Sequence, residues 1–97
     1  MDNLTYDLRV LCRRNRDGSY ATQADRLRSL TLVSRQLLEA GFRRMRGGSI
    51  KSKHVDALLQ RWRTETLAPG TVKNRLTHLR WWAEKVGKAS AIPADNS

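Results

Sequence analysis

The sequence contains little of what cross-linked, metal-binding or membrane-spanning proteins require. Its only cysteine is Cys12, so an internal disulfide and a multi-cysteine metal site are both excluded. No apolar run approaches the roughly 18 residues of a membrane span, and Asp2, Asp7 and Arg9 interrupt any apolar stretch near the start. We therefore expect a cytoplasmic protein with no signal peptide, no cofactor, no metal and no membrane partner.

Acidic residues are scarce as well. The 97 residues include 9 Asp and Glu against 19 Lys and Arg, which gives a net charge of +10. This excess of positive charge favours an anionic partner, above all nucleic acid. The alternative is a protein whose basic charge only keeps it in solution. A chain of this length fits one domain.

No segment alternates polar and apolar residues with period two, so the sequence offers no candidate β-strand. Apolar residues recur instead at helical spacing. This pattern predicts an all-α protein, a compact bundle of about four helices. The expected helices run from Asp2 or Asn3 to about Arg14, from Thr22 to Ala40, from Ser52 to about Glu65, and from Pro69 to Val86.

The second of these helices has start and stop signals. Thr22, with Asp25 three residues later, predicts its beginning as a short capping box. Residues 15–21 before it read as a loop, because Asp17-Gly18 is a turn signal. Gly41 predicts its end. Its expected core face comprises Leu27, Leu30, Ser34, Leu37 and Leu38, with Arg26, Arg28 and Arg35 towards the other sides.

The fourth helix separates two kinds of surface most clearly. Pro69 is tolerated at a first helical position, and Gly87 suits the residue after a helix end. One apolar stripe, spaced 4-3-4-3, is predicted to pack on the core. The other faces carry cations, an amide, a hydroxyl and an indole ring, which suit a helix that faces nucleic acid. The stripe is Val72, Leu76, Leu79, Ala83 and Val86, and the other faces present Lys73, Asn74, Thr77, Arg80 and Trp81.

Two segments read as connections. Residues 43–51 are basic, and Gly47-Gly48 within them favours flexibility. Residues 89–97 contain Pro93 and mainly small residues, which is typical of a linker or a frayed terminus. We therefore expect a helical domain over residues 1–88 that was cut from a longer chain.

Several longer motifs resemble one family. The chain is similar to the N-terminal, core-binding domain of phage-type integrases, the tyrosine recombinases, and especially to proteobacterial prophage integrases. That domain is a SAM-like bundle of about four helices. The residues that carry the likeness are DGSYATQADR at 17–26, HVDALLQRW at 54–62, APGTVKNRLTHLRWWAEKVGK at 68–88, and IPADN at 92–96.

The resemblance implies a function in DNA integration and recombination. In the family, this domain and a C-terminal catalytic domain clamp opposite faces of duplex DNA, and the second and fourth helices face the DNA. IPADN resembles the start of the linker to the catalytic domain. The family's histidine motif is absent, because Ala57 follows His54, and Trp81 follows His78, at its spacing. The resemblance thus implies a fragment that binds DNA without cleaving it, within a full-length tyrosine recombinase associated with the bacterial nucleoid. We expect the fragment to be monomeric without DNA.

The resemblance also implies which residues contact DNA. They are Ser19, Tyr20, Thr22, Gln23 and Arg26 near the second helix, and Thr71, Lys73, Asn74, Arg75, Thr77, His78 and Arg80 on the fourth.

Five other expectations concern single residues. Tyr6 reads as a packing aromatic and Trp82 as a core residue. Trp81 packs on the first helix, on the catalytic domain or beside DNA sugars, in that order of preference. His54 and His78 lack partners at ligand spacing. We therefore expect His54 at a surface or interface, and His78 facing phosphate or solvent.

Two rival functions stay open at this point. A stand-alone helical regulator of transcription would have the same charge and helix count. A basic bundle that docks to an acidic protein is the other alternative. An isolated enzyme fits worst, since no pair of carboxylates and no nucleophile with a nearby base is visible.

Overall fold

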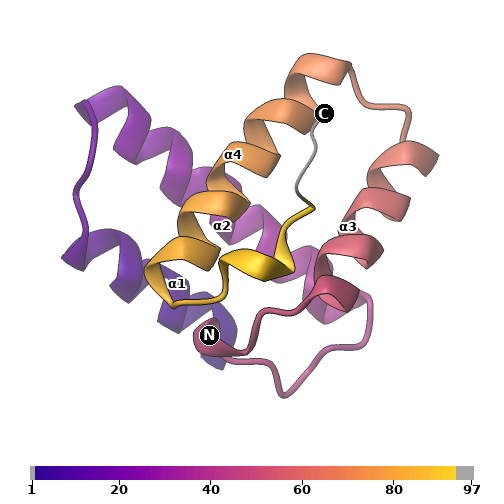
Figure 1. Cartoon of the computed structure of the whole chain (residues 1–97), viewed down its shortest axis with the longest axis horizontal. Helices are drawn as coiled ribbons and strands as arrows, with labels where there is room; N and C mark the ends of the chain where they lie inside the picture. Colours follow the sequence, from indigo (N-terminus) through magenta and orange to yellow (C-terminus); the bar gives the residue numbers. More distant parts are fainter. Residues whose placement is uncertain (1, 94–97) are drawn as a thin grey trace. The chain divides into compact units, whose positions relative to one another are not determined.

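The computed structural model describes residues 2–93, and within them it contains helices and no strand (Figure 1). The predicted all-α fold with four main helices is confirmed. The chain divides into two units, Met1–Gly47 and Gly48–Ser97. The helices are α1 (Asn3–Arg14), α2 (Tyr20–Glu39), α3 (Ser52–Thr64) and α4 (Pro69–Lys85), with two short 3-10 helices, η1 (Gly47–Ser49) and η2 (Ala89–Ala91).

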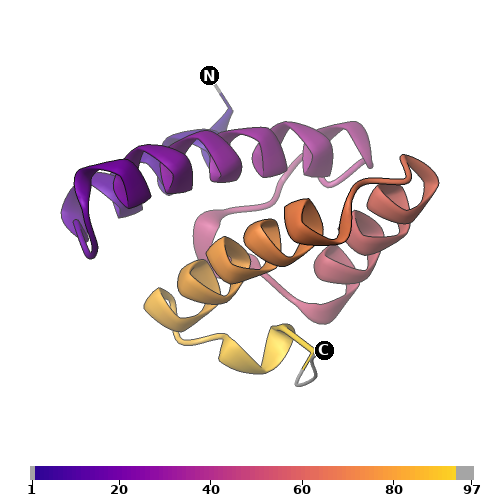
Figure 2. The same ribbon diagram turned by 90° about the horizontal axis from the view of Figure 1, so that it is seen from above.

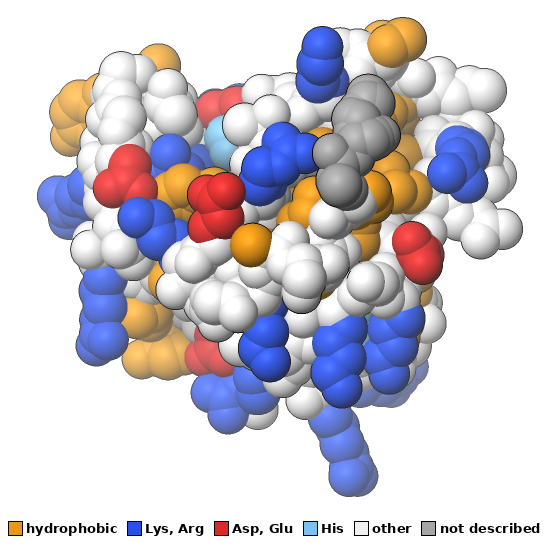
Figure 3. Space-filling model, viewed as in Figure 1, with side chains coloured by type: hydrophobic (Ala, Val, Ile, Leu, Met, Phe, Trp, Pro, Cys, Tyr) orange, Lys and Arg blue, Asp and Glu red, His pale blue; other side chains and the backbone are white. Residues whose placement is uncertain are grey.

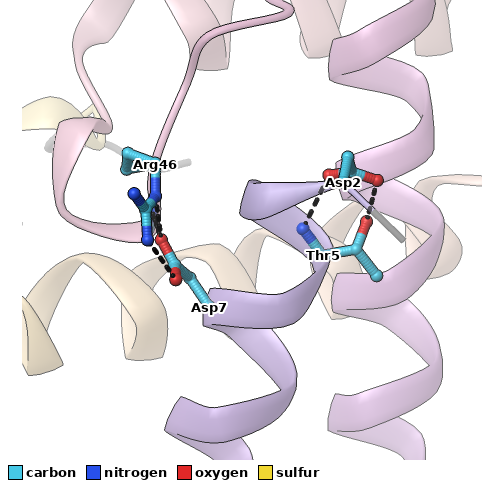
Figure 4. A network of polar contacts seen from close by, with 5 residues as sticks. Asp2, Thr5, Asp7 and Arg46 are labelled. Atoms are coloured by element: carbon cyan, nitrogen blue, oxygen red, sulfur yellow. Dashed lines mark hydrogen bonds and ion pairs between the residues drawn. The ribbon is translucent and has the colours of Figure 1, made fainter.

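The first unit is built on α1 and α2, which lie side by side (Figures 1 and 2). Asp2 caps α1, because its carboxylate accepts hydrogen bonds from the Thr5 backbone N–H at 2.8 Å and from the Thr5 hydroxyl at 2.7 Å (Figure 4). Burial raises the pKa of Asp2, but these hydrogen bonds outweigh it and hold the pKa below its usual value. Leu4 and Leu8, four residues apart on one face of α1, are buried.

Helix α2 begins earlier than we predicted. Its N-cap is Ser19, whose hydroxyl oxygen accepts a hydrogen bond from the Thr22 backbone N–H at 3.2 Å. Thr22, our expected cap, lies inside the first turn. Both residues can cap through a hydroxyl, but Ser is the better N-cap, and the earlier cap extends the helix. The predicted end is confirmed, because Gly41 has a φ of 104° and the Phe42 N–H donates to the Leu37 carbonyl at 3.1 Å.

The core face of α2 differs from the prediction at several positions. Leu30, Ser34 and Leu37 are buried as expected, but Leu27 is 37% exposed. The buried set instead includes Val33 and Arg26, although we had placed Arg26 on another side. Arg26 is buried because its guanidinium donates to the Asp17 carbonyl at 3.0 Å, across the loop before α2. A buried guanidinium needs such acceptors.

The segment after α2 is attached to α1 within the same unit. Arg46 makes two hydrogen bonds to the Asp7 carboxylate, at 2.8 and 3.0 Å, and the Gly47 N–H donates to the same carboxylate at 2.9 Å (Figure 4). The hydrogen bonds from Arg46 lower the pKa of Asp7 despite its partial burial. Our expectation of a flexible loop is therefore wrong for this part, because a carboxylate on a neighbouring helix holds it.

The second unit contains α3, α4 and η2. Val55, Leu58 and Trp62 of α3 are buried at helical spacing. Leu79, Trp82 and Ala83 of α4 are buried too, which confirms Trp82 as a core residue. The remaining residues of the predicted α4 stripe, Val72, Leu76 and Val86, are half-buried.

We had expected His54 at a surface or interface, but it is buried near the start of α3. Its Nδ1 accepts a hydrogen bond from the Lys51 backbone N–H at 2.9 Å. It therefore satisfies one of the donors that a helix start leaves open. Burial, followed by the charges of Lys53 and Lys51, lowers the pKa of His54.

The end of the described chain is more ordered than a plain linker. Residues Ala89–Ala91 form η2, which contacts both α3 and α4, and Ala91 and Ile92 are buried. The part of the IPADN motif after Pro93 lies outside the described residues. Within residues 2–93, no helix is both long and apolar enough to cross a membrane.

Candidate nucleic-acid interface

The polar face of α4 presents the side chains that we predicted to contact DNA. Lys73, Asn74, Thr77 and Arg80 are all exposed. Their spacing of one, three and three residues keeps them within about one-third of the helix circumference. The Thr77 hydroxyl donates to the Lys73 carbonyl at 3.0 Å, so its oxygen still has acceptor capacity. This face combines two cations with an amide and a hydroxyl.

The first turn of α4 adds one backbone donor to this face, the Gly70 N–H, because Pro69 has no N–H and the N–H groups of Thr71 and Val72 donate to the Ala68 carbonyl. The residue before this turn is Ala68, which has no side-chain acceptor, and Pro69, Gly70 and Thr71 are exposed. The Thr71 N–H donates to the Ala68 carbonyl at 3.0 Å. A Cβ built on Gly70 would meet nothing within 4 Å, so another molecule has room to approach the backbone here. Such helix starts favour negatively charged groups.

Two predicted contacts on α4 are placed differently. Arg75 is half-buried, and its guanidinium carbon lies 5.3 Å from the ring centre of Trp62 on α3. Its Nη1 is buried without a hydrogen-bond partner. His78 is only 5% exposed, so our expectation that it faces phosphate or solvent is wrong. It lies one turn before the buried Trp82, on the edge of the core face.

The predicted contacts near α2 form a local network. The Ser19 hydroxyl donates to the Thr22 hydroxyl oxygen at 3.1 Å, and the Gln23 amide donates to the Gly18 carbonyl at 3.0 Å. Together with Arg26 and Asp17, these bonds hold the loop before α2 against its first two turns. Tyr20 is the exception, because it is 90% exposed. Ser19, Thr22, Gln23 and Arg26 thus have structural partners already.

The described residues carry many cationic side chains. No group of three or more His, Cys, Asp or Glu side chains among residues 2–93 could hold a metal ion. Lys and Arg side chains are spread widely over the face shown in Figure 3, with few acidic side chains between them. An α4 face of this composition, in a chain of net charge +10, suits a polyanion.

The family model for the N-terminal domain of phage integrases matches residues 1–92. The chain belongs to this family. The match confirms the resemblance carried by the motifs, and with it an integrase-related function and an all-α, SAM-like fold. The catalytic part of an integrase is a different domain from the one matched. No curated protein and no solved structure matches the chain.

Sequence reasoning missed one feature of this phage integrase N-terminal domain. We expected Tyr6 to be a packing aromatic, but it is 57% exposed. It lines a groove in the first unit together with Tyr20 and with Arg9, Arg13 and Arg16. The signal in the sequence was the cluster of arginines and a tyrosine around the loop after α1. That cluster gave no indication that Tyr6, a flanking residue of the first helix, would join it.

Proposed function

We propose that this domain binds duplex DNA through the exposed face of α4. The observation that carries the proposal is the exposure of Lys73, Asn74, Thr77 and Arg80 along one side of a 17-residue helix. An α-helix fits the major groove, where base edges can be read. The domain would serve a site-specific tyrosine recombinase as one half of a clamp on DNA.

Different residues of this face suit different parts of DNA. Lys73 and Arg80 are cations that neutralise phosphates. Asn74 carries an amide that can pair with both the acceptor and the donor on the major-groove edge of adenine. Thr71 lies in the first turn of α4, where its hydroxyl and the Gly70 N–H favour a phosphate oxygen.

The remaining predicted contacts have supporting functions in this proposal. Arg75 stacks on Trp62 and fixes the orientation of α4 relative to α3, and His78 packs at the edge of the same face. Ser19, Thr22 and Gln23 approach DNA with the loop before α2, and Arg26 holds that loop in place. Tyr20, exposed beside them, completes the second contact region that the family resemblance implies.

The domain has a limited part in the recombination reaction. We propose that residues 1–88 form the DNA-binding domain and that residues 89–97 lead towards a catalytic domain of the full-length recombinase. The nucleophilic tyrosine belongs to that catalytic domain, so this chain binds DNA and cleaves none. Its place of action is the bacterial cytoplasm, on the nucleoid, and it is monomeric until DNA brings copies together.

Two substitutions on α4 test the proposal. Asn74→Ala should cost about 1–3 kcal/mol on a duplex that contains the preferred adenine and little on other duplexes. Lys73→Ala should weaken binding to all duplexes alike and reduce the salt slope by about one. Fluorescence anisotropy with a panel of labelled duplexes measures both effects.

A matched control keeps the change of charge constant. Lys53→Ala removes an exposed lysine from α3, outside the α4 face, and should weaken DNA binding less than Lys73→Ala. Equal losses for the two variants would mean that only net charge matters. No binding of any duplex at low salt would reject the proposed function.

A further inference from the structure

The first unit contains a groove of about 500 Å³ between α1 and α2. Its walls come from residues 6–27, so the groove lies wholly within this unit. Among the described residues, the large hydrophobic side chains that stay exposed are Tyr6, Tyr20 and Leu27, and all three line this groove. Exposed apolar side chains that gather in one place mark an interaction site, whereas single ones scattered over a surface do not.

The floor of the groove is apolar and uncharged. Between the arginines the groove is lined by the half-buried Cys12 of α1 and by Ala24 of α2, and we call this apolar part of the lining its floor. Burial raises the pKa of the Cys12 thiol, so the sulfur is neutral at physiological pH and behaves as a small apolar group. Leu27 is 37% exposed although the same helix buries Leu30 completely. The stripe of α2 therefore extends beyond the core and out into the groove.

The rim of the groove carries charge of one sign. Arg9, Arg13 and Arg16 line it, and none of its lining residues is acidic. Arg16 is directed by a hydrogen bond from its Nε to the Arg13 carbonyl at 3.3 Å. Tyrosine and arginine are the residue types most enriched, with tryptophan, among the side chains that dominate protein–protein binding. An apolar floor between arginines thus fits a partner with apolar and acidic side chains.

We propose that this groove docks an acidic, amphipathic helix of a partner protein. Its apolar residues would pack on Tyr6, Tyr20 and Leu27, and its carboxylates would pair with Arg9, Arg13 and Arg16. This goes beyond the proposed DNA binding, which rests on α4. Tyr20 and Gln23 line the groove as well, so a docked partner would cover these two residues of the second DNA-contact region.

Two other occupants fit the groove less well. A second copy of this chain carries a net charge of +10, so its approach to the arginine rim is repulsive. Duplex DNA satisfies the arginines, but its phosphate backbone gains nothing from an apolar floor. Only an acidic and apolar partner uses both parts of the site.

The test uses the 97-residue chain and a synthetic helical peptide. The probe has about 15 residues, with Leu at every third or fourth position and Glu on the flanking positions. A second peptide has Lys in place of each Glu. Anisotropy of the labelled peptides and amide shifts of the protein measure binding. The Glu peptide should bind and shift amides of α1 and α2, and the Lys peptide should bind at least about tenfold more weakly.

Three variants locate the site. Arg13→Glu and Leu27→Ser should each weaken the Glu peptide by about tenfold. Arg35→Glu changes the charge equally at an exposed α2 position that does not line the groove, and should change affinity by less than about threefold. Leu27→Ser leaves the charge of the rim intact. It therefore tests the apolar contact independently of any effect that Arg13→Glu has on the fold. Lys73→Ala should leave peptide binding unchanged, which separates this test from that of DNA binding.

Several results would overturn the proposal. One is equal binding of the Glu and Lys peptides, or no binding of the Glu peptide at about 1 mM. Another is a loss of peptide affinity with Arg35→Glu that is as large as the loss with Arg13→Glu. If a DNA duplex displaces the peptide, and Leu27→Ser weakens DNA binding, the groove belongs to DNA. If Leu27→Ser abolishes a dimer seen by sedimentation, it belongs to a second copy.

Discussion

Three polar residues in the interior show how hydrogen-bond partners allow a polar side chain to be buried. Arg26, Ser34 and His54 are all buried. The first donates to the Asp17 carbonyl, the second shares a 2.7 Å hydrogen bond with the Thr5 hydroxyl, and the third accepts from the Lys51 N–H. Each bond offsets the cost of removing the group from water. Helical periodicity predicted the inward position of Ser34 but not those of Arg26 and His54, because it contains no information about hydrogen-bond partners.

Leu79 illustrates the apolar case and gives a prediction. It is 0% exposed, and Leu79→Ala removes its packing and leaves a cavity. The expected loss is about 2–5 kcal/mol in the free energy of unfolding. A thermal or urea melt followed by circular dichroism measures it. Leu27→Ala is the matched control, because the same truncation at a 37% exposed position should cost well under half as much. Equal losses would contradict the assignment of Leu79 to the core.

His54 makes stability depend on pH. Its pKa lies below the usual 6.5 because burial disfavours the charged ring, so the folded state binds fewer protons than the unfolded state between the two values. This contribution to stability is complete above pH 6.5, falls as the pH drops below 6.5, and levels off below the folded pKa. Protonation also removes the Nδ1 acceptor for the Lys51 N–H. Melting temperatures between about pH 5 and 7.5 measure the slope.

The His54→Ala variant isolates this effect. It should be less stable than the parent above pH 6.5, because the Lys51 N–H loses its acceptor, and its stability should depend less on pH in the same interval. An unchanged pH slope in the variant would show that another group causes it.

At the scale of elements, the sequence predicted where helices exist better than where they begin. Pro69, Gly41 and Gly87 marked boundaries correctly because each acts through its own backbone geometry, as the positive φ of both glycines shows. The start of α2 was ambiguous, because Ser19 and Thr22 are both acceptable caps. In the structure the helix begins after Ser19, and Gln23 and Arg26 donate to the carbonyl groups of Gly18 and Asp17 just before that cap.

The attachment of the segment around Gly47 to α1 was not predictable, since it depends on a contact between residues 40 positions apart. A Cβ at Gly47 would lie 2.9 Å from the Cβ of Asp7, closer than such atoms ever approach. Gly47→Ala should therefore destabilise the first unit by about 1–3 kcal/mol, because the backbone must move away from Asp7 and weaken its hydrogen bonds. Denaturant melts measure the change.

The neighbouring Gly48 provides the control. A Cβ there would meet nothing within 4 Å, and Gly48 has no positive φ. Gly48→Ala should be neutral or stabilising by up to about 1 kcal/mol, because alanine has less freedom in the unfolded chain. If both variants lose the same stability, the close approach to Asp7 is not the cause.

At the scale of the molecule, the sequence predicted half of the candidate site. The exposed residues of α4 could be read from one helix, because they lie opposite its own apolar stripe. The positions of Arg75 and His78 could not be predicted in this way, since Arg75 stacks on Trp62 of another helix and His78 is buried. The groove was also hidden from sequence reasoning, because it exists only where α1 and α2 lie together. Sites made by one element are predictable in a way that sites made by two are not.

The charge of the whole chain leads to the last prediction. With +10 spread over 97 residues, most of the binding energy for DNA should come from phosphate contacts and the release of counterions. If the domain neutralises about four to six phosphates, log K falls against log salt with a slope of about −4 to −5. Affinity then drops by about two to three orders of magnitude between roughly 50 and 200 mM salt. Fluorescence anisotropy over a salt series measures this slope.

Discrimination between a cognate and a random duplex should be modest, because the proposed catalytic domain supplies the other half of the clamp. A denaturing gel should show no covalent adduct with DNA. Binding that is independent of salt would reject the electrostatic basis, and an adduct would overturn the proposal that catalysis belongs to another domain.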